Sequence, residues 1–281
     1  MHLNTPSAVA LGRLAGVLTR TPTISVIHGT FLDPKGWRSV AFAVAEAPLA
    51  WLSKVTITVN EEDASFYRIL CPRRLVQVAP AGGGGVTIDP QRIIHSMAPP
   101  LPTALYLGRF APDKHLDLLI KSWQLARERV PQLSLRLVGG VASGDQSWVP
   151  PALPGLECAP WTDDPIGEIL AASMVVSASS REGFPMVVAE TIVLGVPVVA
   201  VSNRGTREIS QTQDVPLYLI PKEEMAIADA IVTVASQPES IRKSRRDLAE
   251  IWGPGATSAF HVDILEKVIL SRRTIDSSGL A

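Results

Sequence analysis

Residues 180–201 of the chain have the sequence SREGFPMVVAETIVLGVPVVAV. Proline suits the first position of a helix, so Pro185 predicts a helix that runs to about Leu194. The apolar residues 197–201 predict a buried strand, which Gly195 separates from that helix. A turn, a helix and a wholly apolar strand in this order are typical of a parallel sheet with helical crossovers.

Strands and helices alternate on both sides of this stretch. Short apolar runs predict further strands at 104–107, 133–138, 174–177 and 217–220. Helices are predicted at 115–129, 166–172 and 223–236. The expected fold class is therefore α/β, with a doubly wound parallel sheet over this part of the chain.

The residues before about 100 form a separate and shorter pattern. Helices are predicted at 7–18 and 39–52, and strands at 23–27 and 54–59, which together make about half of a doubly wound domain. Residues 96–102 contain three prolines and predict a linker. The expected organisation is a partial Rossmann-like domain over 1–98, a complete one over 99–250, and a helix within 251–281 that crosses back to the first.

Composition narrows the function classes. Hydrophobic residues make up 46% of the chain and charged residues 19%, which is typical of a folded globular protein. The net charge of −1 gives no electrostatic reason to expect a nucleic-acid partner. The longest apolar stretch, residues 186–202, contains Glu190, Gly195 and Pro197, so no membrane span is expected and the chain is predicted to be cytoplasmic.

Polar residues follow three of the predicted strands, where ligands bind in open parallel sheets. Gly108 and Arg109 end one strand, and Lys114 opens the next helix. An arginine and a lysine placed in this way can converge on a diphosphate, although such side chains are more often solvated. Gly139 after another strand leaves room for a nucleobase or simply makes a turn.

The turn before the helix at residue 185 is a more specific feature. Gly183 permits close approach of a ligand to the backbone, and the free amides at the start of the helix suit a phosphate or a sugar hydroxyl. Glu182 precedes this turn, and Glu190 lies inside the helix, where its carboxylate can accept hydrogen bonds from ribose hydroxyls. A loop carboxylate and a helix-dipole partner are the structural alternatives for these two glutamates.

Four segments resemble retaining glycosyltransferase family 4, whose members have the two-domain GT-B fold. They are LGRFAPDK at 107–114, LVG at 137–139, SREGFPMVVAE at 180–190 and GVPVVA at 195–200. The resemblance implies that Arg109 and Lys114 neutralise the donor diphosphate, Glu182 contacts the transferred sugar and Glu190 binds ribose. The remaining donor-binding residues that it implies are Gly108, Gly139, Gly183, Phe184, Pro185, Met186 and Val187.

Weaker resemblance extends into the first part of the chain. Residues 27–29, Ile-His-Gly, are similar to a strand end where the family places a histidine near the donor sugar, so His28 joins Arg109, Lys114 and Glu182 as a predicted catalytic residue. A buried turn histidine, satisfied by backbone, is the alternative. The motifs are most similar to enzymes of bacterial capsular and exopolysaccharide synthesis. The expected acceptor is a glycan or lipid-linked glycan, with a peripheral position at the inner face of the plasma membrane.

The resemblance implies no cofactor and no catalytic metal, and the sequence has no Asp-x-Asp pair or His/Cys cluster. Relative to the family pattern, the chain lacks a first strand with its glycine-rich loop, so we expect an exposed strand edge and apolar faces. Three functions stay open. The first is transfer of a sugar, most commonly from a uridine diphosphate donor, and the second is a non-catalytic nucleotide-sugar-binding subunit with a partner chain. The third, a sugar-nucleotide epimerase on the same fold, is disfavoured by the pair of glutamates.

Overall fold

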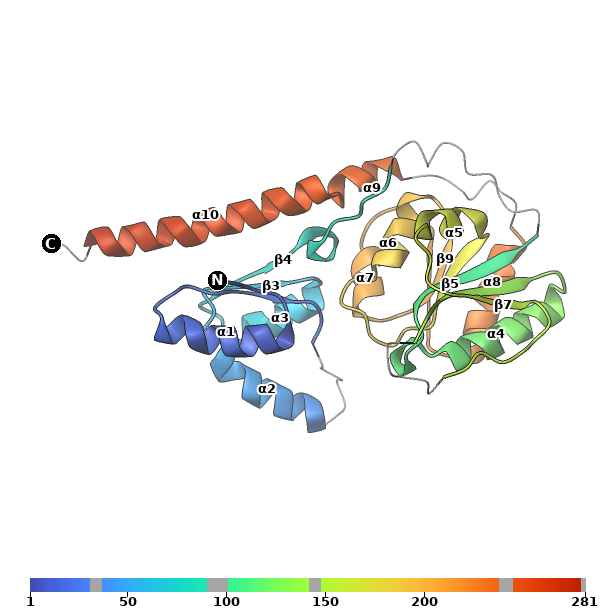
Figure 1. Ribbon diagram of the computed structural model, residues 1–281, viewed down its shortest axis with the longest axis horizontal. Helices are drawn as coiled ribbons and strands as arrows, with labels where there is room; N and C mark the ends of the chain where they lie inside the picture. Colours follow the sequence, from blue (N-terminus) through green and yellow to red (C-terminus); the bar gives the residue numbers. More distant parts are fainter. Residues whose placement is uncertain (31–36, 90–100, 142–147, 238–244, 279–281) are drawn as a thin grey trace. The chain divides into compact units, whose positions relative to one another are not determined.

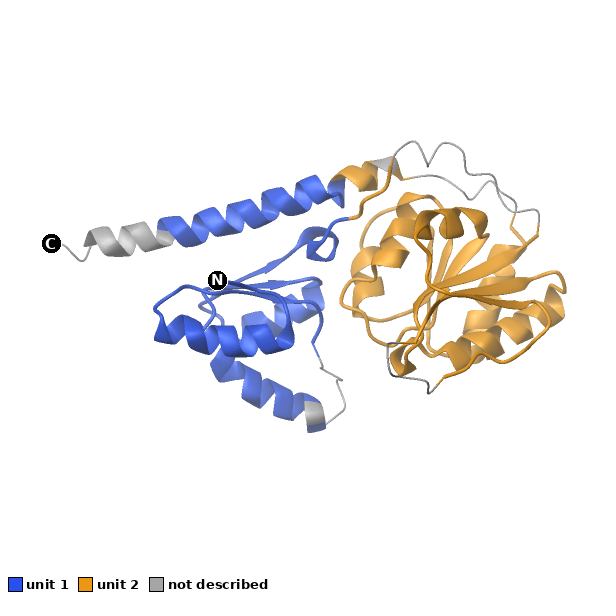
Figure 2. Ribbon diagram, viewed as in Figure 1, with its two compact units in different colours: residues 1–85, 251–281 blue, residues 86–250 orange. Residues whose placement is uncertain are grey.

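The computed structural model describes residues 1–30, 37–89, 101–141, 148–237 and 245–278. The chain forms two compact units, one made of residues 1–85 and 251–281 and the other of residues 86–250 (Figure 2). Most of the predicted linker at 96–102 lies outside the described residues.

The second unit is built on a six-stranded, wholly parallel sheet in the order β10-β9-β8-β5-β6-β7 (Figure 1). Its strands are β5 (Thr103–Arg109), β6 (Ser134–Gly140), β7 (Leu156–Ala159), β8 (Met174–Ser177), β9 (Val198–Val201) and β10 (Leu217–Ile220). The strands predicted at 174–177 and 217–220 have the predicted bounds. Strand β5 begins one residue earlier and ends two residues later than the strand predicted at 104–107, and β6 begins one residue later and ends two residues later than the strand predicted at 133–138.

Helices cover both faces of this sheet. They are α4 (Leu116–Arg129), α5 (Pro165–Ala171), α6 (Met186–Val193), α7 (Arg204–Ser210), α8 (Glu224–Ala235) and α9 (Arg246–Ile251), with a single 3-10 turn η3 (Pro112–Lys114) before α4. Helices α4 and α8 share a buried core with the sheet, centred on Leu119, Trp123 and Ile231. Figure 1 shows α5, α6 and α7 on the opposite face, which is the doubly wound arrangement that the sequence predicts.

Several helix ends differ from the prediction by one residue, because the caps lie one residue outside the helix. Asp164 caps α5 by accepting a hydrogen bond at Oδ1 from Gly167 N, at 3.0 Å, and Pro185 is the N-cap of α6. His115, predicted to open α4, instead precedes it with φ of 50°. This left-handed conformation turns the chain between η3 and α4.

The first unit contains a four-stranded parallel sheet in the order β1-β2-β3-β4. Its elements are β1 (His2–Leu3), α1 (Pro6–Leu18), β2 (Ile24–Ile27), α2 (Trp37–Ala50), β3 (Val55–Thr58), α3 (Glu61–Leu70), β4 (Leu75–Val78), η1 (Pro80–Gly83) and α10 (Pro254–Ser278). Figure 1 shows α1, α2 and α3 on one face of the sheet and α10 on the other. Ile264 and Val268 of α10 pack on β2 and β3.

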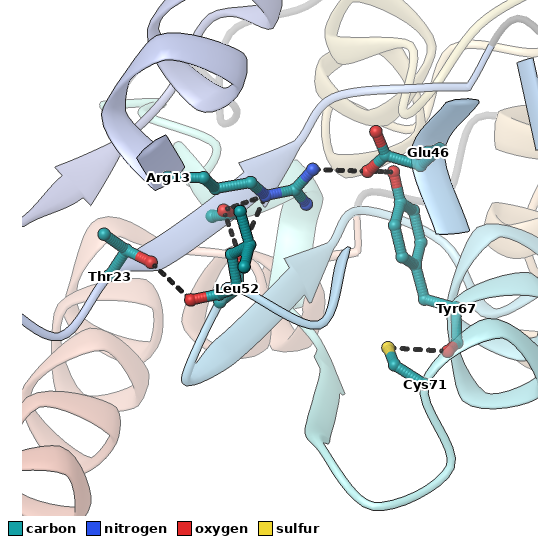
Figure 3. Close-up of polar contacts among 8 residues, drawn as sticks. Arg13, Thr23, Glu46, Leu52, Tyr67 and Cys71 are labelled. Atoms are coloured by element: carbon teal, nitrogen blue, oxygen red, sulfur yellow. Dashed lines mark hydrogen bonds and ion pairs between the residues drawn. The ribbon is translucent and has the colours of Figure 1, made fainter. Parts of the chain in front are cut away.

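A buried polar network joins α1, α2 and α3 beneath this sheet (Figure 3). Arg13 is fully buried and donates from Nη1 to Glu46 Oε1 at 2.6 Å, and from Nε to Ser53 Oγ at 2.9 Å. The Tyr67 hydroxyl donates to the same Glu46 oxygen at 2.8 Å. Burial and the neighbouring Glu46 carboxylate raise the pKa of Tyr67. The network therefore fixes α1 and α2 side by side through a paired, desolvated charge.

Candidate functional site

A cavity of about 380 Å³ lies in the second unit at the carboxyl ends of β5 and β8. These two strands are neighbours, yet the chain leaves β5 toward β6 on one side and returns to β8 on the other. Such a reversal of strand order opens a crevice between the loops that follow the two strands, and ligands bind there in open α/β sheets. The fold therefore places a binding site at this point before any side chain is considered.

Two cations line this cavity, and both come from the segment after β5. Arg109 is exposed at the end of the strand, and its side chain pairs with no carboxylate of the described residues. Lys114 ends η3 and is largely buried, with 12% of its side chain exposed. The left-handed backbone of His115 lets the chain turn directly after Lys114 while Leu116 enters the core.

Glu182 lies opposite these cations on the loop after β8. Its Oε1 accepts a hydrogen bond from Lys114 Nζ at 2.6 Å, and Asp113 Oδ2 lies 3.3 Å from the same nitrogen. The Lys114–Glu182 contact joins the β5 loop to the β8 loop across the cavity. It also restrains both side chains where a ligand carrying phosphate and hydroxyl groups would meet them.

The start of α6 forms the adjoining wall, through Phe184, Pro185, Met186 and Val187. The N-cap, Pro185, provides no side-chain hydrogen bond to the helix. A helix start without a side-chain cap keeps backbone donors and positive partial charge for an anion or a hydroxyl. Gly183, which precedes this wall, is half-buried beside Glu182.

The loop that carries Glu182 is held from behind by the start of α7. Gly205 N donates to Glu182 O at 3.1 Å, and Asn203 Nδ2 donates to Ser179 O at 2.9 Å. A Cβ at position 205 would lie 2.6 Å from Pro185 Cδ, so only glycine allows α7 to approach this closely. Asn203 and Gly205 were not among the predicted site residues. A helix-capping residue and a glycine shortly after a predicted strand could have indicated that this helix start supports the site.

Three predicted donor residues, Gly139, Gly183 and Glu190, do not line the cavity. Gly139 is buried with φ of 142°, and a Cβ there would lie 1.9 Å from Gly108 O. Close approach of β5 to β6 therefore accounts for this glycine. Glu190 lies on α6, and burial raises the pKa of its carboxyl. No described residue forms a side-chain hydrogen bond with Glu190.

Two aromatic residues that the sequence reasoning overlooked also line the cavity. Tyr106 donates from its hydroxyl to Arg109 O at 2.6 Å, and burial, followed by the charge of Glu182, raises its pKa. Trp161 lies in the loop after β7, is 58% exposed and packs near Gly140. An exposed indole beside a polar cavity offers a flat apolar surface on which a planar ring can stack.

His28 belongs to the first unit, where it follows β2. It lines a separate cavity of about 310 Å³ together with Asn4, Glu46 and Tyr67. Burial lowers the pKa of His28, which favours the neutral imidazole. The structure thus brings Gly108, Arg109, Lys114, Glu182 and the 184–187 wall together in one unit, and His28 lies in the other.

The described residues contain neither a cluster of metal ligands nor a helix that could span a membrane. No group of three or more His, Cys, Asp or Glu side chains among them could hold a metal ion. None of the helices within these ranges combines the length and apolar character needed to cross a membrane.

Most of the second unit matches the model of a known protein family. Residues 101–237 match the family model described as glycosyl transferases group 1. No sequence among the curated proteins matches the chain.

Solved structures agree with this match at the level of the fold. HepE from Anabaena, in complex with UDP and glucose, superposes with a TM-score of 0.75 at 20% identity, covering 95% of this chain and 78% of HepE. Sucrose-phosphate synthase from Thermosynechococcus elongatus gives a TM-score of 0.72 at 18% identity, covering 96% and 73%. The pneumococcal O-GlcNAc transferase GtfA, in complex with UDP and GlcNAc, gives 0.65 at 15% identity, covering 92% and 55%. The α/β fold with two Rossmann-like parallel sheets is that of the GT-B glycosyltransferases.

Proposed function

We propose that this chain, whose residues 101–237 match the glycosyl transferases group 1 family, is a retaining enzyme of glycosyltransferase family 4. It transfers a sugar from a UDP-sugar to a lipid-linked or polysaccharide acceptor. One observation carries the proposal: Arg109, Lys114, Glu182 and the start of α6 line a single cavity at the switch point of the sheet.

In the proposed reaction the acceptor oxygen bonds to the anomeric carbon as the bond to the β-phosphate breaks, and the acceptor's hydroxyl proton passes to the departing phosphate oxygen. Negative charge then accumulates on the departing diphosphate. Arg109 donates to two phosphate oxygens, Lys114 supplies a compact charge, and the backbone N–H groups of Met186 and Val187 donate hydrogen bonds. A well-placed donor of this kind is worth about 3 to 4 kcal/mol to the transition state.

In this proposal the carboxylates accept hydrogen bonds from the hydroxyl groups of the donor. Glu182, held by Lys114 at 2.6 Å, accepts hydrogen bonds from the transferred sugar. Glu190, which follows Met186 of the cavity wall by one helical turn, accepts them from the ribose, and Trp161 stacks against the uracil. His28, as a neutral imidazole, contributes from the first unit by bonding to a hydroxyl of donor or acceptor. Attack from the face of the leaving group retains the anomeric configuration.

The two cations neutralise the diphosphate without a divalent metal in this scheme. We therefore expect turnover to be unchanged when EDTA replaces added Mg²⁺ or Mn²⁺ in the assay. A strict requirement for either ion would contradict this part of the proposal.

Radiolabelled UDP-sugars, incubated with the purified chain and a bacterial membrane fraction, test the reaction. Incorporation of label into lipid or polysaccharide, with NMR showing the anomeric configuration of the donor, supports a retaining transferase. Inverted configuration contradicts the retaining mechanism. UDP binding without incorporation from any donor favours the non-catalytic nucleotide-sugar-binding subunit, and conversion of the free donor to an epimer favours an epimerase.

A further inference from the structure

The cavity of about 310 Å³ in the first unit is lined by residues of β2 and of the helices α1, α2 and α3. Its exposed lining residues Asn4, His28 and Gly29 follow β1 and β2 in the chain. The cavity therefore opens at the carboxyl ends of these two strands. Its volume is at the lower end of the range for ligand pockets, about 300 to 1,000 Å³, so a ligand of this cavity is small.

The walls of this cavity are almost wholly apolar. They consist of the ring of Phe42 and of side chains from α1 and β2, namely Pro6, Val9, Ala10, Val26 and Ile27. A sugar ring carries a hydroxyl on most of its carbons, and such walls offer these groups no hydrogen bond. Burial of unpaired hydroxyls is unfavourable, so the walls disfavour a sugar and favour a hydrocarbon group.

The inner end of the cavity holds a polar group with unused hydrogen-bonding capacity. Glu46 is 9% exposed, and its Oε1 accepts hydrogen bonds from both Arg13 Nη1 and the Tyr67 hydroxyl. Its Oε2 accepts a hydrogen bond from none of the described residues, and Figure 3 shows this oxygen pointing away from Arg13 and Tyr67. A buried carboxylate oxygen without a partner is unfavourable, so the cavity favours a ligand that donates a hydrogen bond at this end.

The charge at the inner end distinguishes between two kinds of donor. The Glu46 carboxylate is already paired with the Arg13 guanidinium at 2.6 Å, so the buried pair carries no net charge. A ligand ammonium would add a second buried cation beside a single carboxylate, whereas a hydroxyl adds no charge. The inner end therefore favours a neutral O–H donor.

We propose that this cavity is a binding site for a small apolar alcohol. The hydrocarbon part packs against Val9, Val26 and Phe42, and the hydroxyl donates to Glu46 Oε2. The contacts from Arg13 and Tyr67 hold the carboxylate in place before the ligand arrives, which lowers the entropy lost on binding. The inference goes beyond the proposed function, because this ligand is neither a nucleotide sugar nor a glycan and no covalent bond changes.

Calorimetric titration of the full chain with 2-phenylethanol tests this inference, and three related probes identify the group that is recognised. Ethylbenzene lacks the hydroxyl and is smaller, 2-phenylethylammonium replaces the hydroxyl with a cation, and glucose lacks the apolar part. We expect one site for 2-phenylethanol, and affinity weaker by about tenfold or more for each of the other three. These measurements use the parent chain and do not depend on the folding of a variant.

A variant locates the ligand in the chain. Ala10 lines the cavity from α1, so Ala10→Leu places a larger side chain in it and should weaken 2-phenylethanol binding on the order of tenfold or more. Ala41→Leu is the matched control, because Ala41 is exposed on α2 and does not line the cavity. It should bind like the parent. Thermal unfolding shows whether each variant is folded, and Ala10→Val replaces Ala10→Leu if that variant is not.

The inference is overturned if 2-phenylethanol does not bind the parent, or if ethylbenzene, 2-phenylethylammonium or glucose binds as tightly. A folded Ala10→Leu protein with parental affinity, or equal loss of binding in Ala41→Leu, places the ligand elsewhere and also overturns it. UDP titration of the same proteins reports separately on the proposed function. Failure of 2-phenylethanol to bind a chain that binds UDP contradicts this inference alone, and failure of UDP alone contradicts only the proposed function.

Discussion

Replacing Gly205 with alanine tests whether the loop at residues 182–185 must stay where α7 holds it. The new Cβ would lie 2.6 Å from Pro185 Cδ, 3.0 Å from Gly183 O and 3.1 Å from Glu182 O. Two of these atoms are backbone and the third belongs to a proline ring, so none can rotate away. The loop itself has to move away from α7 and toward the cavity.

The magnitude of the effect differs between stability and activity. Overpacking of this kind costs about 1 to 3 kcal/mol, and the gain in helix propensity from Gly to Ala returns up to about 1 kcal/mol. The net loss of stability is therefore between about 0 and 3 kcal/mol. Displacement of catalytic groups by about 1 Å costs on the order of a hundredfold in turnover. Glu182 and the start of α6 move with the loop, so activity should fall far more than stability.

Steady-state transfer kinetics and urea unfolding of Gly205→Ala measure the two effects. Gly255→Ala is the control, because a Cβ at that position meets nothing within 4 Å. We expect kcat/KM to fall at least tenfold for Gly205→Ala and to be unchanged for Gly255→Ala. A folded Gly205→Ala protein with kcat/KM within twofold of the parent would refute the role given to this contact.

Three further variants test other parts of the account. Burial raises the pKa of Glu190. As the pH drops through that raised pKa, the carboxylate becomes protonated and accepts ribose hydroxyls less well, so UDP affinity should fall. In Glu190→Gln, a titration series should show no such pH dependence. Trp161→Ala should weaken UDP binding by about 1 to 3 kcal/mol in calorimetry if the indole stacks on the base, and unchanged affinity would exclude stacking. Glu46→Leu leaves the Arg13 cation buried without its carboxylate and should destabilise the first unit by about 3 to 5 kcal/mol in urea unfolding. The double variant Arg13→Met with Glu46→Leu buries no unpaired charge and should recover most of the lost stability. A double variant as unstable as Glu46→Leu would contradict the charge-burial argument.

Much of the second unit could be predicted from the sequence, because its central strands β8 and β9 are buried apolar runs and its strands and helices alternate regularly. The strand at Leu217–Ile220 has the predicted bounds. The residues of the donor site could be predicted because they lie at the ends of strands and at the start of a helix. A parallel sheet brings these positions together at the edge formed by the carboxyl ends of its strands. The comparisons support the glycosyltransferase assignment, while the roles of the individual residues stay predictions.

Long-range packing could not be predicted. Nothing local indicates that Gly205 must touch Pro185, or that Gly139 serves the approach of β5 to β6. Arg13 is fully buried, and the Glu46 carboxylate that accepts its hydrogen bond lies 33 residues away in the chain. These contacts join residues far apart in the chain, so they depend on the assembled sheet and not on periodicity or turn chemistry.

Calorimetric titration of UDP into the parent chain, Arg109→Ala and Arg129→Ala tests the donor site most directly. Arg129 lies on the surface at the end of α4, where it pairs with Asp229, so its variant controls for the loss of one cation. The account predicts one UDP site in the parent, affinity at least tenfold weaker in Arg109→Ala, and parental affinity in Arg129→Ala. Affinity of Arg109→Ala within twofold of the parent would contradict it.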